Sequence, residues 1–195
     1  IVVCGLSLVS QVFATIDPSV RCTFLVEDGA PIAAGDKLAI LEGDARSLRA
    51  GERTALNLLQ RACAVASKTS AYVSQAAGRL RITDTRKTMP GLRALDRYAV
   101  RCGGGHNHRN DLGAGVLIKE NHIRWAGSLE AAIKGARDYA PHTLRSRCEV
   151  ENVQEATRAV EAGADALLLD NMNDAEVKEA VALVGGRAFI EVSGG

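Results

Sequence analysis

The sequence has little net charge and no long apolar run, and each absence excludes a class of function. Its 195 residues include 24 Lys and Arg against 23 Asp and Glu, which leaves a formal net charge of +1 at pH 7. Broad electrostatic binding to nucleic acid or to an anionic membrane needs a strongly basic surface, so we expect neither partner. No apolar stretch reaches the ~18 residues of a membrane-spanning helix. The composition indicates a globular protein of one or two domains.

The sequence also has no C-x-x-C pair, which argues against a zinc site or a disulfide framework. Its five cysteines are odd in number and widely scattered: Cys4, Cys22, Cys63, Cys102 and Cys148. We interpret them as buried free thiols in a reducing compartment, which favours a cytoplasmic location. His106 and His108 form an H-x-H pair, but they lie in a Gly-rich loop without an evident third ligand. A zinc hydrolase built on them is therefore a lesser alternative.

The first part of the chain has the pattern of a small β-rich unit followed by a helix. The apolar start, "IVVCGLSLVSQVF", lacks a basic leader and is interpreted as a core segment whose preceding residues are missing. Residues 20–44 alternate in the manner of strands, with turns at the Asp-Gly and Gly-Asp dipeptides. Residues 52–77 then have helical spacing, with Ala55, Leu59 and Ala62 on one face.

From residue 79 onward, strand and helix patterns alternate. The expected strands are residues 79–83, 115–120, 147–151, 166–170 and 188–192, and the expected helices are 91–102, 128–140, 153–164 and 174–184. Ser128, Asn152 and Asn173 are candidate N-caps of three of these helices. Apolar strands that alternate with helices predict a parallel sheet buried on both faces, either in a (β/α) barrel or in an open doubly wound sheet. The absence of G-x-G-x-x-G after the first strand disfavours the doubly wound nucleotide fold.

Polar residues follow each expected strand at the point where the strand ends. The runs are residues 84–87, 119–122, 149–152, 170–171 and 191–195. In (β/α) barrels the carboxyl ends of the strands carry the active site, and a full barrel takes ~250 residues. We therefore predict an incomplete (β/α) barrel in residues 79–195, preceded by the small β-rich unit and its helix. On this interpretation the chain is truncated at both ends.

The polar groups at this edge have two kinds of charge. The cations are Arg86, Lys87, His108, Arg109 and Lys119, and the carboxylates on later strands are Glu149 and Asp170. Arg and Lys suit a small polyanionic substrate, because Arg binds carboxylate or phosphate with two parallel hydrogen bonds. The carboxylates suit ribose hydroxyls or Mg²⁺, which proteins hold through one or two carboxylates plus substrate phosphates. Solvated loop charges are the alternative interpretation of each residue taken alone.

Seven motifs, taken in order, resemble one enzyme family. They are "ERTALNLLQR" (52–61), "DTRKTMPGLRALDRYAV" (84–100), "GGGHNHRNDL" (103–112), "IKENHI" (118–123), "EVEN" (149–152), "LLLDNM" (167–172) and "EVSGG" (191–195). Together they resemble the quinolinate phosphoribosyltransferases, the carboxylating nicotinate-nucleotide pyrophosphorylases of NAD biosynthesis. The likeness covers nearly the whole chain.

The resemblance implies a barrel of fewer than eight strands in residues 79–195, packed against part of an amino-terminal α/β sandwich domain with linking helices in residues 1–78. It also implies a homodimer or higher oligomer. It implies that quinolinate and phosphoribosyl pyrophosphate give nicotinate mononucleotide, CO₂ and pyrophosphate, with Mg²⁺. Carried over by motif, Arg86, His108, Arg109 and Lys119 bind quinolinate, Thr85 and Lys87 flank Arg86 with Lys87 on phosphate, and Ser193, Gly194 and Gly195 form a phosphate-binding turn. Glu149 and Asp170 lie near the ribose hydroxyls and Mg²⁺, and together with Lys119 they form the expected catalytic group. Arg53 would reach the site of the neighbouring subunit.

Two alternatives remain open. A paralogue of the same fold associated with molybdenum transport shares much of this motif set. The joint presence of five residues favours quinolinate: Arg53, Arg86, His108, Arg109 and Lys119. From another class, the segment "VEDGAPIAAGDKLAILEG" is similar to a lipoyl- or biotinyl-type module. In this chain Lys37 lies inside a "GDKL" turn rather than at an exposed hairpin tip.

Overall fold

The structure is a computed structural model that describes residues 1–194. It divides into two compact units, of which unit 1 comprises residues 1–110 and unit 2 begins at Asp111. The domain boundary was predicted after residue 78, where the sequence pattern changes, whereas unit 1 extends to residue 110. No helix within residues 1–194 combines the length and the apolar character needed to cross a membrane.

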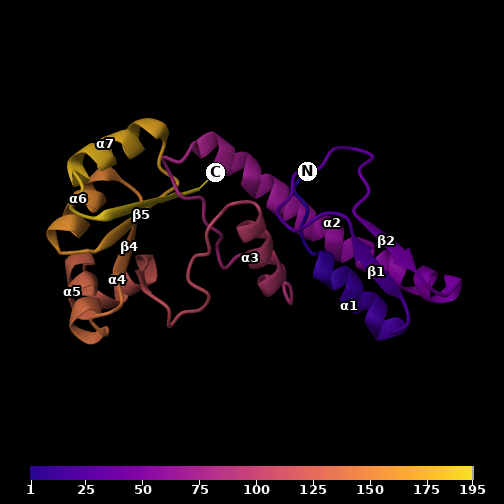
Figure 1. The fold of residues 1–195 in the computed structure, drawn as a ribbon. Helices are drawn as coiled ribbons and strands as arrows, with labels where there is room; N and C mark the ends of the chain where they lie inside the picture. Colours follow the sequence, from indigo (N-terminus) through magenta and orange to yellow (C-terminus); the bar gives the residue numbers. More distant parts are fainter. Residues whose placement is uncertain (195) are drawn as a thin grey trace. The chain divides into compact units, whose positions relative to one another are not determined.

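Unit 1 contains a two-stranded antiparallel sheet and three helices (Figure 1). Its elements are α1 (Leu6–Ile16), β1 (Arg21–Phe24), β2 (Ala39–Glu42), α2 (Ala45–Ala76) and α3 (Arg93–Cys102). The register of the sheet places Arg21 opposite Glu42. Both strands lie within residues 20–44, as the alternating pattern predicted. The apolar start of the chain is a core segment, because Val3, Cys4 and Phe13 are buried.

The long helix α2 organises the packing of unit 1. It begins at Ala45, seven residues earlier than the periodicity predicted, because the Asp44 side chain accepts a hydrogen bond from the Arg46 N–H at 2.8 Å. Close packing against α1 depends on Gly51, where an added Cβ would lie 2.5 Å from Cε1 of Phe13. Since such a separation is far below ordinary contact, a larger residue at this position would displace the aromatic ring.

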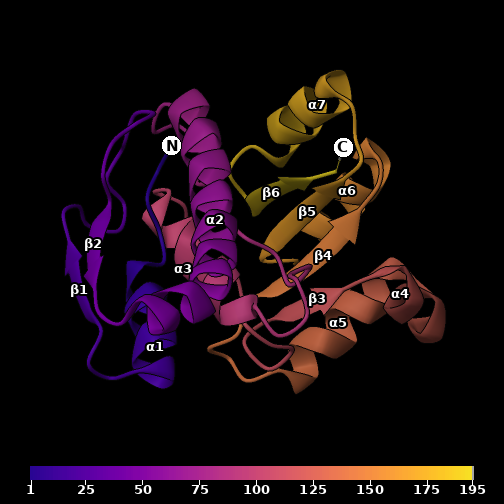
Figure 2. The same cartoon turned by 90° about the vertical axis from the view of Figure 1, so that its right-hand side faces the viewer.

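Unit 2 is a four-stranded parallel sheet in the order β3-β4-β5-β6, with helices after the strands (Figure 2). Its elements are β3 (Val116–Ile118), α4 (Glu120–Ala126), α5 (Leu129–Tyr139), β4 (Ser146–Val150), α6 (Val153–Glu161), β5 (Ala166–Asp170), α7 (Asp174–Val184) and β6 (Phe189–Ser193). The predicted caps of α5, α6 and α7 are confirmed, because Ser128, Asn152 and Asn173 each accept hydrogen bonds from backbone N–H groups of the following first turn. The α/β prediction with a parallel sheet is therefore confirmed.

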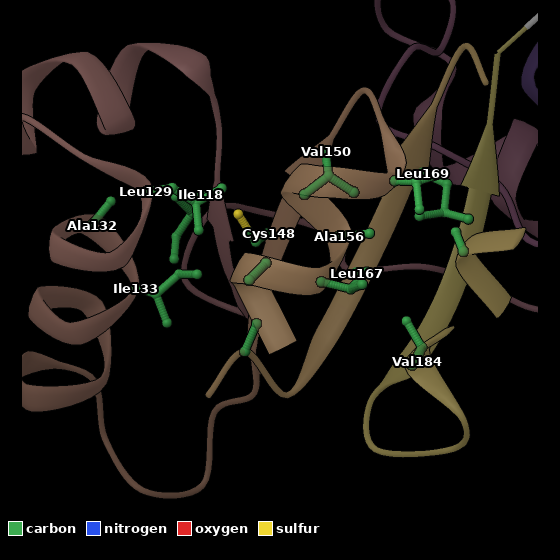
Figure 3. Close-up of a cluster of buried hydrophobic side chains, with 14 residues drawn as sticks. Ile118, Leu129, Ala132, Ile133, Cys148, Val150, Ala156, Leu167, Leu169 and Val184 are labelled. Carbon is green, nitrogen blue, oxygen red and sulfur yellow. The ribbon is translucent and has the colours of Figure 1, made fainter. Parts of the chain in front are cut away.

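The core of unit 2 lies between the sheet and its helices (Figure 3). Cys148, Val150, Leu167 and Leu169 point from β4 and β5 toward α5, α6 and α7, where they meet residues such as Ile133. Successive strand residues point to opposite faces, so the alternating positions lie on the second face. Apart from Ala166, which is buried, the positions on this face of β4, β5 and β6 are polar or not fully buried: Arg147, Glu149, Leu168, Asp170, Phe189, Glu191 and Ser193. One face of the sheet is thus an apolar core and the other carries the polar groups.

Two elements differ from the predictions. Residues 79–83 do not form a strand, because only Thr83 makes a bridge, to His106, and Leu80 is largely exposed. Arginines and apolar residues alternate in residues 79–83 as in a strand, but among the described residues no neighbouring strand pairs with this segment along its length. The strand expected at residues 115–120 is also shorter than predicted, because β3 ends at Ile118 and the short helix α4 begins at Glu120.

Candidate functional site

The polar residues of unit 2 gather where its parallel strands end. Lys119 follows β3 directly, Glu149 is the penultimate residue of β4, Asp170 ends β5 and Ser193 ends β6. Because all four strands run parallel, their carboxyl ends form a single edge. The structure therefore brings together these four predicted site residues within unit 2, as the sequence pattern indicated.

Lys119 and Glu149 form an ion pair at this edge, in which the Lys119 Nζ donates to Glu149 Oε2. The lysine side chain is 49% exposed, whereas that of Glu149 is only 17% exposed. The backbone of Lys119 is held separately, because its N–H donates to Nδ1 of His122 at 3.0 Å. The cationic and acidic halves expected of the site are thus in direct contact here, and an anionic ligand would compete with Glu149 for the ammonium group.

The Asp170 carboxylate is oriented by two neighbours. Oδ1 accepts a hydrogen bond from Oγ of Ser193 at 2.7 Å, and Oδ2 accepts one from Nδ2 of Asn171 at 2.9 Å. Asn171 has a φ of 54°, and its N–H donates to the Ser193 carbonyl at 2.9 Å. Ser193 therefore orients the carboxylate in this arrangement. Its predicted phosphate-binding role, shared with Gly194, stays a prediction, and Gly195 lies outside the described residues.

A second ion pair lies on the same face of the sheet. Arg147 on β4 donates to Oε1 of Glu191 on β6 at 2.6 Å, across the intervening strand β5. Both side chains are largely shielded from solvent. The register aligns Glu149, Leu168 and Glu191 in one row across three strands. The polar face therefore presents three carboxylates, two of which are paired with cations of this chain.

The cationic residues of unit 1 lie on irregular backbone that a buried carboxylate holds in place. Asp84, whose side chain is 6% exposed, accepts hydrogen bonds from the His108 N–H at 2.7 Å and from Nδ2 of Asn107 at 2.5 Å. It also accepts one from Arg97 at 3.2 Å, and Arg97 donates in turn to the His108 carbonyl at 3.0 Å. The loop that carries His108 and Arg109 is thereby fixed to the segment that carries Arg86.

The main chain joins the same two segments. The His106 N–H donates to the Ile82 carbonyl at 2.8 Å, and the Asp84 N–H donates to the His106 carbonyl at 3.1 Å. These bonds make the bridge between Thr83 and His106. His106 thus serves through its backbone, and within residues 1–194 it belongs to no group of three metal-ligating side chains.

The predicted residues around Arg86 are exposed. Thr85, Arg86 and Lys87 all face solvent, and the Lys87 N–H donates to Oγ1 of Thr85 at 3.0 Å. The Arg86 carbonyl accepts from the guanidinium of Arg93 at 3.2 Å, which anchors the backbone and leaves the Arg86 side chain to project. Arg53 lies exposed on α2 in the same unit. These positions are compatible with contacts to a ligand or to another subunit.

The donor set at the edge of unit 2 suits Mg²⁺ bound together with a phosphate ligand. Glu149 and Asp170 contribute two half-buried carboxylates, and a carboxylate has about four lone-pair positions. Mg²⁺ in proteins usually takes one or two carboxylates, and substrate phosphates and water complete its shell. Within residues 1–194 no group of three ligating side chains forms at this edge. These residues therefore suit an ion held jointly by protein carboxylates and substrate phosphates, and not an ion enclosed by protein ligands alone.

Three positioning residues lay outside the predicted site. Asp84, Arg97 and Asn171 all fall inside the recognised motifs, but their sequence pattern did not reveal that they hold other site residues. One signal in the sequence could have identified Asp84: it is a charged residue inside the otherwise strand-like run "ITDT". A charge that the chain buries needs partners, and those partners lie 13 and 24 residues further along the chain.

A parallel sheet with helices, and with a Lys–Glu pair and an oriented aspartate at its carboxyl edge, defines an α/β protein whose candidate site lies at that edge. Comparison with family models identifies the family. Residues 1–63 match the model of the quinolinate phosphoribosyl transferase N-terminal domain, and residues 65–195 match that of its C-terminal domain. The chain belongs to the quinolinate phosphoribosyltransferase family.

Individual relatives agree with this assignment. The chain is 38% identical over 192 residues to a probable carboxylating nicotinate-nucleotide pyrophosphorylase of Bacillus subtilis, covering 98% of this chain and 66% of the relative. It is 36% identical over 191 residues to the human carboxylating nicotinate-nucleotide pyrophosphorylase, covering 94% of this chain and 64% of the relative. The chain thus spans slightly less than two thirds of the length of these relatives.

A solved structure shows the same fold. The crystal structure of NadC from Streptococcus pyogenes matches with a TM-score of 0.91 at 41% identity, covering 99% of this chain and 69% of that chain. The nicotinate-nucleotide pyrophosphorylase from Francisella tularensis matches with a TM-score of 0.92 at 36% identity, covering 99% and 69%. The fold prediction is confirmed by both.

Proposed function

We propose that the protein containing this chain is a decarboxylating quinolinate phosphoribosyltransferase of NAD biosynthesis. It would convert quinolinate and phosphoribosyl pyrophosphate into nicotinate mononucleotide, CO₂ and pyrophosphate. The observation that carries this proposal is that both domain models of the family match, together covering nearly the whole chain. The paired Lys119 and Glu149 beside the oriented Asp170 support it, because they supply both signs of charge at the edge where such sites form.

The substrates would be held by opposite charge. Quinolinate is a dicarboxylate, and in our proposal it binds to Arg86, His108, Arg109 and Lys119. Lys87 contacts phosphate, Thr85 supports the Lys87 backbone, and the turn at Ser193, Gly194 and Gly195 accommodates the phosphoribosyl group. Arg recognises carboxylates with a planar fork, whereas Lys acts as a point charge. Arg86 and Lys87 suit this role because both residues are exposed to solvent.

The chemistry needs no nucleophile from the protein. The pyridine nitrogen forms a bond to C1 of the ribose while the bond from C1 to pyrophosphate breaks, and the leaving group takes the electron pair. Positive charge develops at C1, where Glu149 and Asp170 stabilise it. In the second stage the bond from the ring to its carboxylate breaks, CO₂ leaves, and the electron pair stays on the ring carbon beside the pyridinium nitrogen. Solvent then supplies the proton, so catalysis is positioning plus electrostatics.

The proposal includes Mg²⁺, a subunit partner and a compartment. Glu149 and Asp170 would hold Mg²⁺ together with the phosphates of the substrate, and the ion would supply positive charge to the leaving pyrophosphate. Arg53, exposed on α2, would complete the site of a second subunit in a homodimer or larger oligomer. The five cysteines are free thiols, which supports a reducing, cytoplasmic environment.

The test uses the intact protein with quinolinate, phosphoribosyl pyrophosphate and Mg²⁺. We expect CO₂ and nicotinate mononucleotide in equal amounts, detected with carboxyl-labelled quinolinate and by chromatography. Lys119→Ala should lose this activity, while Lys134→Ala, which removes an exposed lysine of α5 in the same unit, should keep it. Failure of the unaltered protein to release either product would overturn the proposal, and would leave a non-catalytic member of the family.

A further inference from the structure

Two cysteines and an aspartate from three separate segments of unit 1 meet at one point. Cys4 precedes α1, Asp28 lies in the loop between β1 and β2, and Cys102 ends α3. The two sulfur atoms and a carboxylate oxygen all lie within 4.8 Å of one another. Within residues 1–194 this is the one group of at least three side chains whose ligand atoms are close enough to share a metal ion.

The spacing of these atoms suits a tetrahedral zinc ion. Zinc binds cysteine sulfur at about 2.3 Å and carboxylate oxygen at about 2.0–2.2 Å, so its ligands lie roughly 3.5–3.8 Å apart. Three atoms within 4.8 Å of one another can reach one central ion with small side-chain rotations. Two soft thiolates and one carboxylate are ligands that zinc accepts, whereas Mg²⁺ and Ca²⁺ favour oxygen alone.

Other groups already hold the aspartate in place. Asp28 Oδ1 accepts a hydrogen bond from the Leu6 N–H at 3.1 Å, and Oδ2 accepts one from the Tyr98 hydroxyl at 2.9 Å. Donors that hydrogen-bond to a ligating carboxylate in this way orient it, and they are a regular part of metal sites.

The backbone around Cys4 is equally fixed. The Cys4 N–H donates to Sγ of Cys63 on α2 at 3.3 Å, and the preceding Val3 forms hydrogen bonds with Gly29 and Ala30. Cys4 is fully buried, while Asp28 and Cys102 are partly exposed. The exposed side gives an ion a route in from solvent, and a water molecule could complete the tetrahedron from there.

We propose that Cys4, Asp28 and Cys102 bind one Zn²⁺ ion, which joins the amino-terminal segment to the end of α3. None of the three belongs to the proposed substrate site, so the role is structural. On binding, two sulfur–zinc bonds and one oxygen–zinc bond form, and the two thiol protons pass to solvent. No oxidant or reductant is involved. Since the ion binds the folded unit and bridges segments that separate on unfolding, it stabilises unit 1.

The test is a metal titration of the intact, reduced protein after removal of metals with a chelator. Co²⁺ is the probe, because thiolate-to-cobalt charge transfer gives a near-ultraviolet absorption that carboxylate or histidine ligation does not. We expect one Co²⁺ per chain with this absorption, displacement by Zn²⁺, and a higher thermal midpoint with Zn²⁺ present. Cys102→Ser and Asp28→Asn should each weaken binding at least ~10-fold, since even outer-shell changes have effects of this size.

Two controls keep the outcome specific. Cys22→Ser removes another partly exposed thiol of unit 1, and His106→Gln removes a member of the H-x-H pair, so both should bind Co²⁺ as the unaltered protein does. Circular dichroism verifies that each variant is folded. The proposal is overturned if the unaltered protein shows no thiolate absorption and retains no zinc after desalting. It is equally overturned if Cys102→Ser keeps the absorption, or if His106→Gln abolishes it.

Discussion

The two units of this chain position charged residues by different physical means. In unit 2, Glu149, Asp170 and Ser193 extend from parallel strands whose backbones are hydrogen-bonded to their neighbours. In unit 1, Arg86 and His108 lie on irregular backbone, which is held by main-chain bonds to His106 and by hydrogen bonds to the side chain of Asp84. A regular sheet distributes the support over many backbone bonds, whereas in this part of unit 1 one carboxylate accepts three of the supporting bonds.

Because of this difference, we expect the residues proposed to bind ligand in unit 2 to contribute little to folding stability, whereas in unit 1 the same carboxylate supports both folding and the proposed binding loop. Removal of a side chain at the strand ends of unit 2 leaves the hydrogen bonds of the sheet and the opposite, apolar face unchanged. Removal of Asp84 leaves His108, Asn107 and Arg97 without their shared acceptor. The same kind of substitution should therefore affect ligand binding alone in one unit, and both folding and binding in the other.

The largest expected effect comes from the apolar face of unit 2. Leu167→Ala removes a fully buried side chain of β5 and should lower the free energy of unfolding by about 2–5 kcal/mol. Denaturant unfolding followed by circular dichroism measures this loss. Val181→Ala, at a half-exposed position of α7, is the control and should change stability by less than about 1 kcal/mol. Equal losses in the two variants would show that Leu167 does not lie in a packed core.

Asp84→Ala should have the next largest effect on stability and should also disturb binding. It removes the acceptor of the partly buried His108 N–H and of Arg97, which costs about 1–3 kcal/mol. Hydrogen exchange should accelerate at the His108 amide, because that N–H loses its acceptor. Glu52→Ala, at an exposed residue of α2, is the control and should leave this amide protected. Unchanged exchange at His108 in Asp84→Ala would contradict the role assigned to this carboxylate.

Lys119→Ala tests whether a site residue of unit 2 affects ligand binding without affecting stability. Loss of a charge-assisted contact costs about 1.5–3 kcal/mol, which corresponds to roughly 10- to 150-fold weaker quinolinate binding. Stability should change by less than about 1 kcal/mol, because the Lys119 side chain is half exposed and exposed ion pairs contribute little. Calorimetric titration and denaturant unfolding give the two values. A large loss of stability with unchanged quinolinate binding would contradict the expectation that Lys119 in unit 2 affects binding alone.

The smallest effect concerns the pH dependence of Asp165. Burial acts to raise the pKa of this carboxyl, but the backbone N–H and hydroxyl of Ser146, together with Arg137, outweigh it and hold the pKa below its ordinary value of 3.8. Its contribution to stability is therefore present above pH 3.8 and declines as pH falls through the lower folded-state pKa. Asp165→Asn should be destabilised by about 1 kcal/mol at pH 7.

That difference should shrink in acid. Unfolding of Asp165→Asn and of the unaltered protein, measured at pH 7 and again below pH 3, should give a gap that narrows at the lower pH. Asp138→Asn, at an exposed residue of α5, serves as the control for a general charge effect. A gap that stays constant across this range would mean that the carboxylate charge of Asp165 does not stabilise the fold.

Local signals were sufficient for the regular part of the chain. The starts of α5, α6 and α7 could be predicted because Ser128, Asn152 and Asn173 cap the first turns of these helices. The segment at residues 79–83 could not, because a strand requires a partner along its length and only Thr83 has one. The start of α4 is also fixed locally, by the bond from the Lys119 N–H to His122, but it was missed because Lys and His are not the residues of the usual capping-box pattern.

For the candidate site, too, the sequence predicted some features and not others. The motifs identified Lys119, Glu149 and Asp170 as neighbours at one edge, since parallel strands align their carboxyl ends. They did not reveal that Lys119 and Glu149 pair, nor that Ser193 and Asn171 orient Asp170. Such pairings depend on the register between strands, which the identities of single residues do not specify.

The sequence by itself determined the family, the alternation of strands and helices after residue 110, and the residue types available for binding anions. These follow from short-range chemistry: periodicity, caps and contiguous motifs. Only the tertiary structure decided which distant groups meet, as for Asp84 with His108 or Cys4 with Cys102. The reason is physical, because contacts between residues far apart in the chain arise from the packing of whole elements, and no local pattern encodes that geometry.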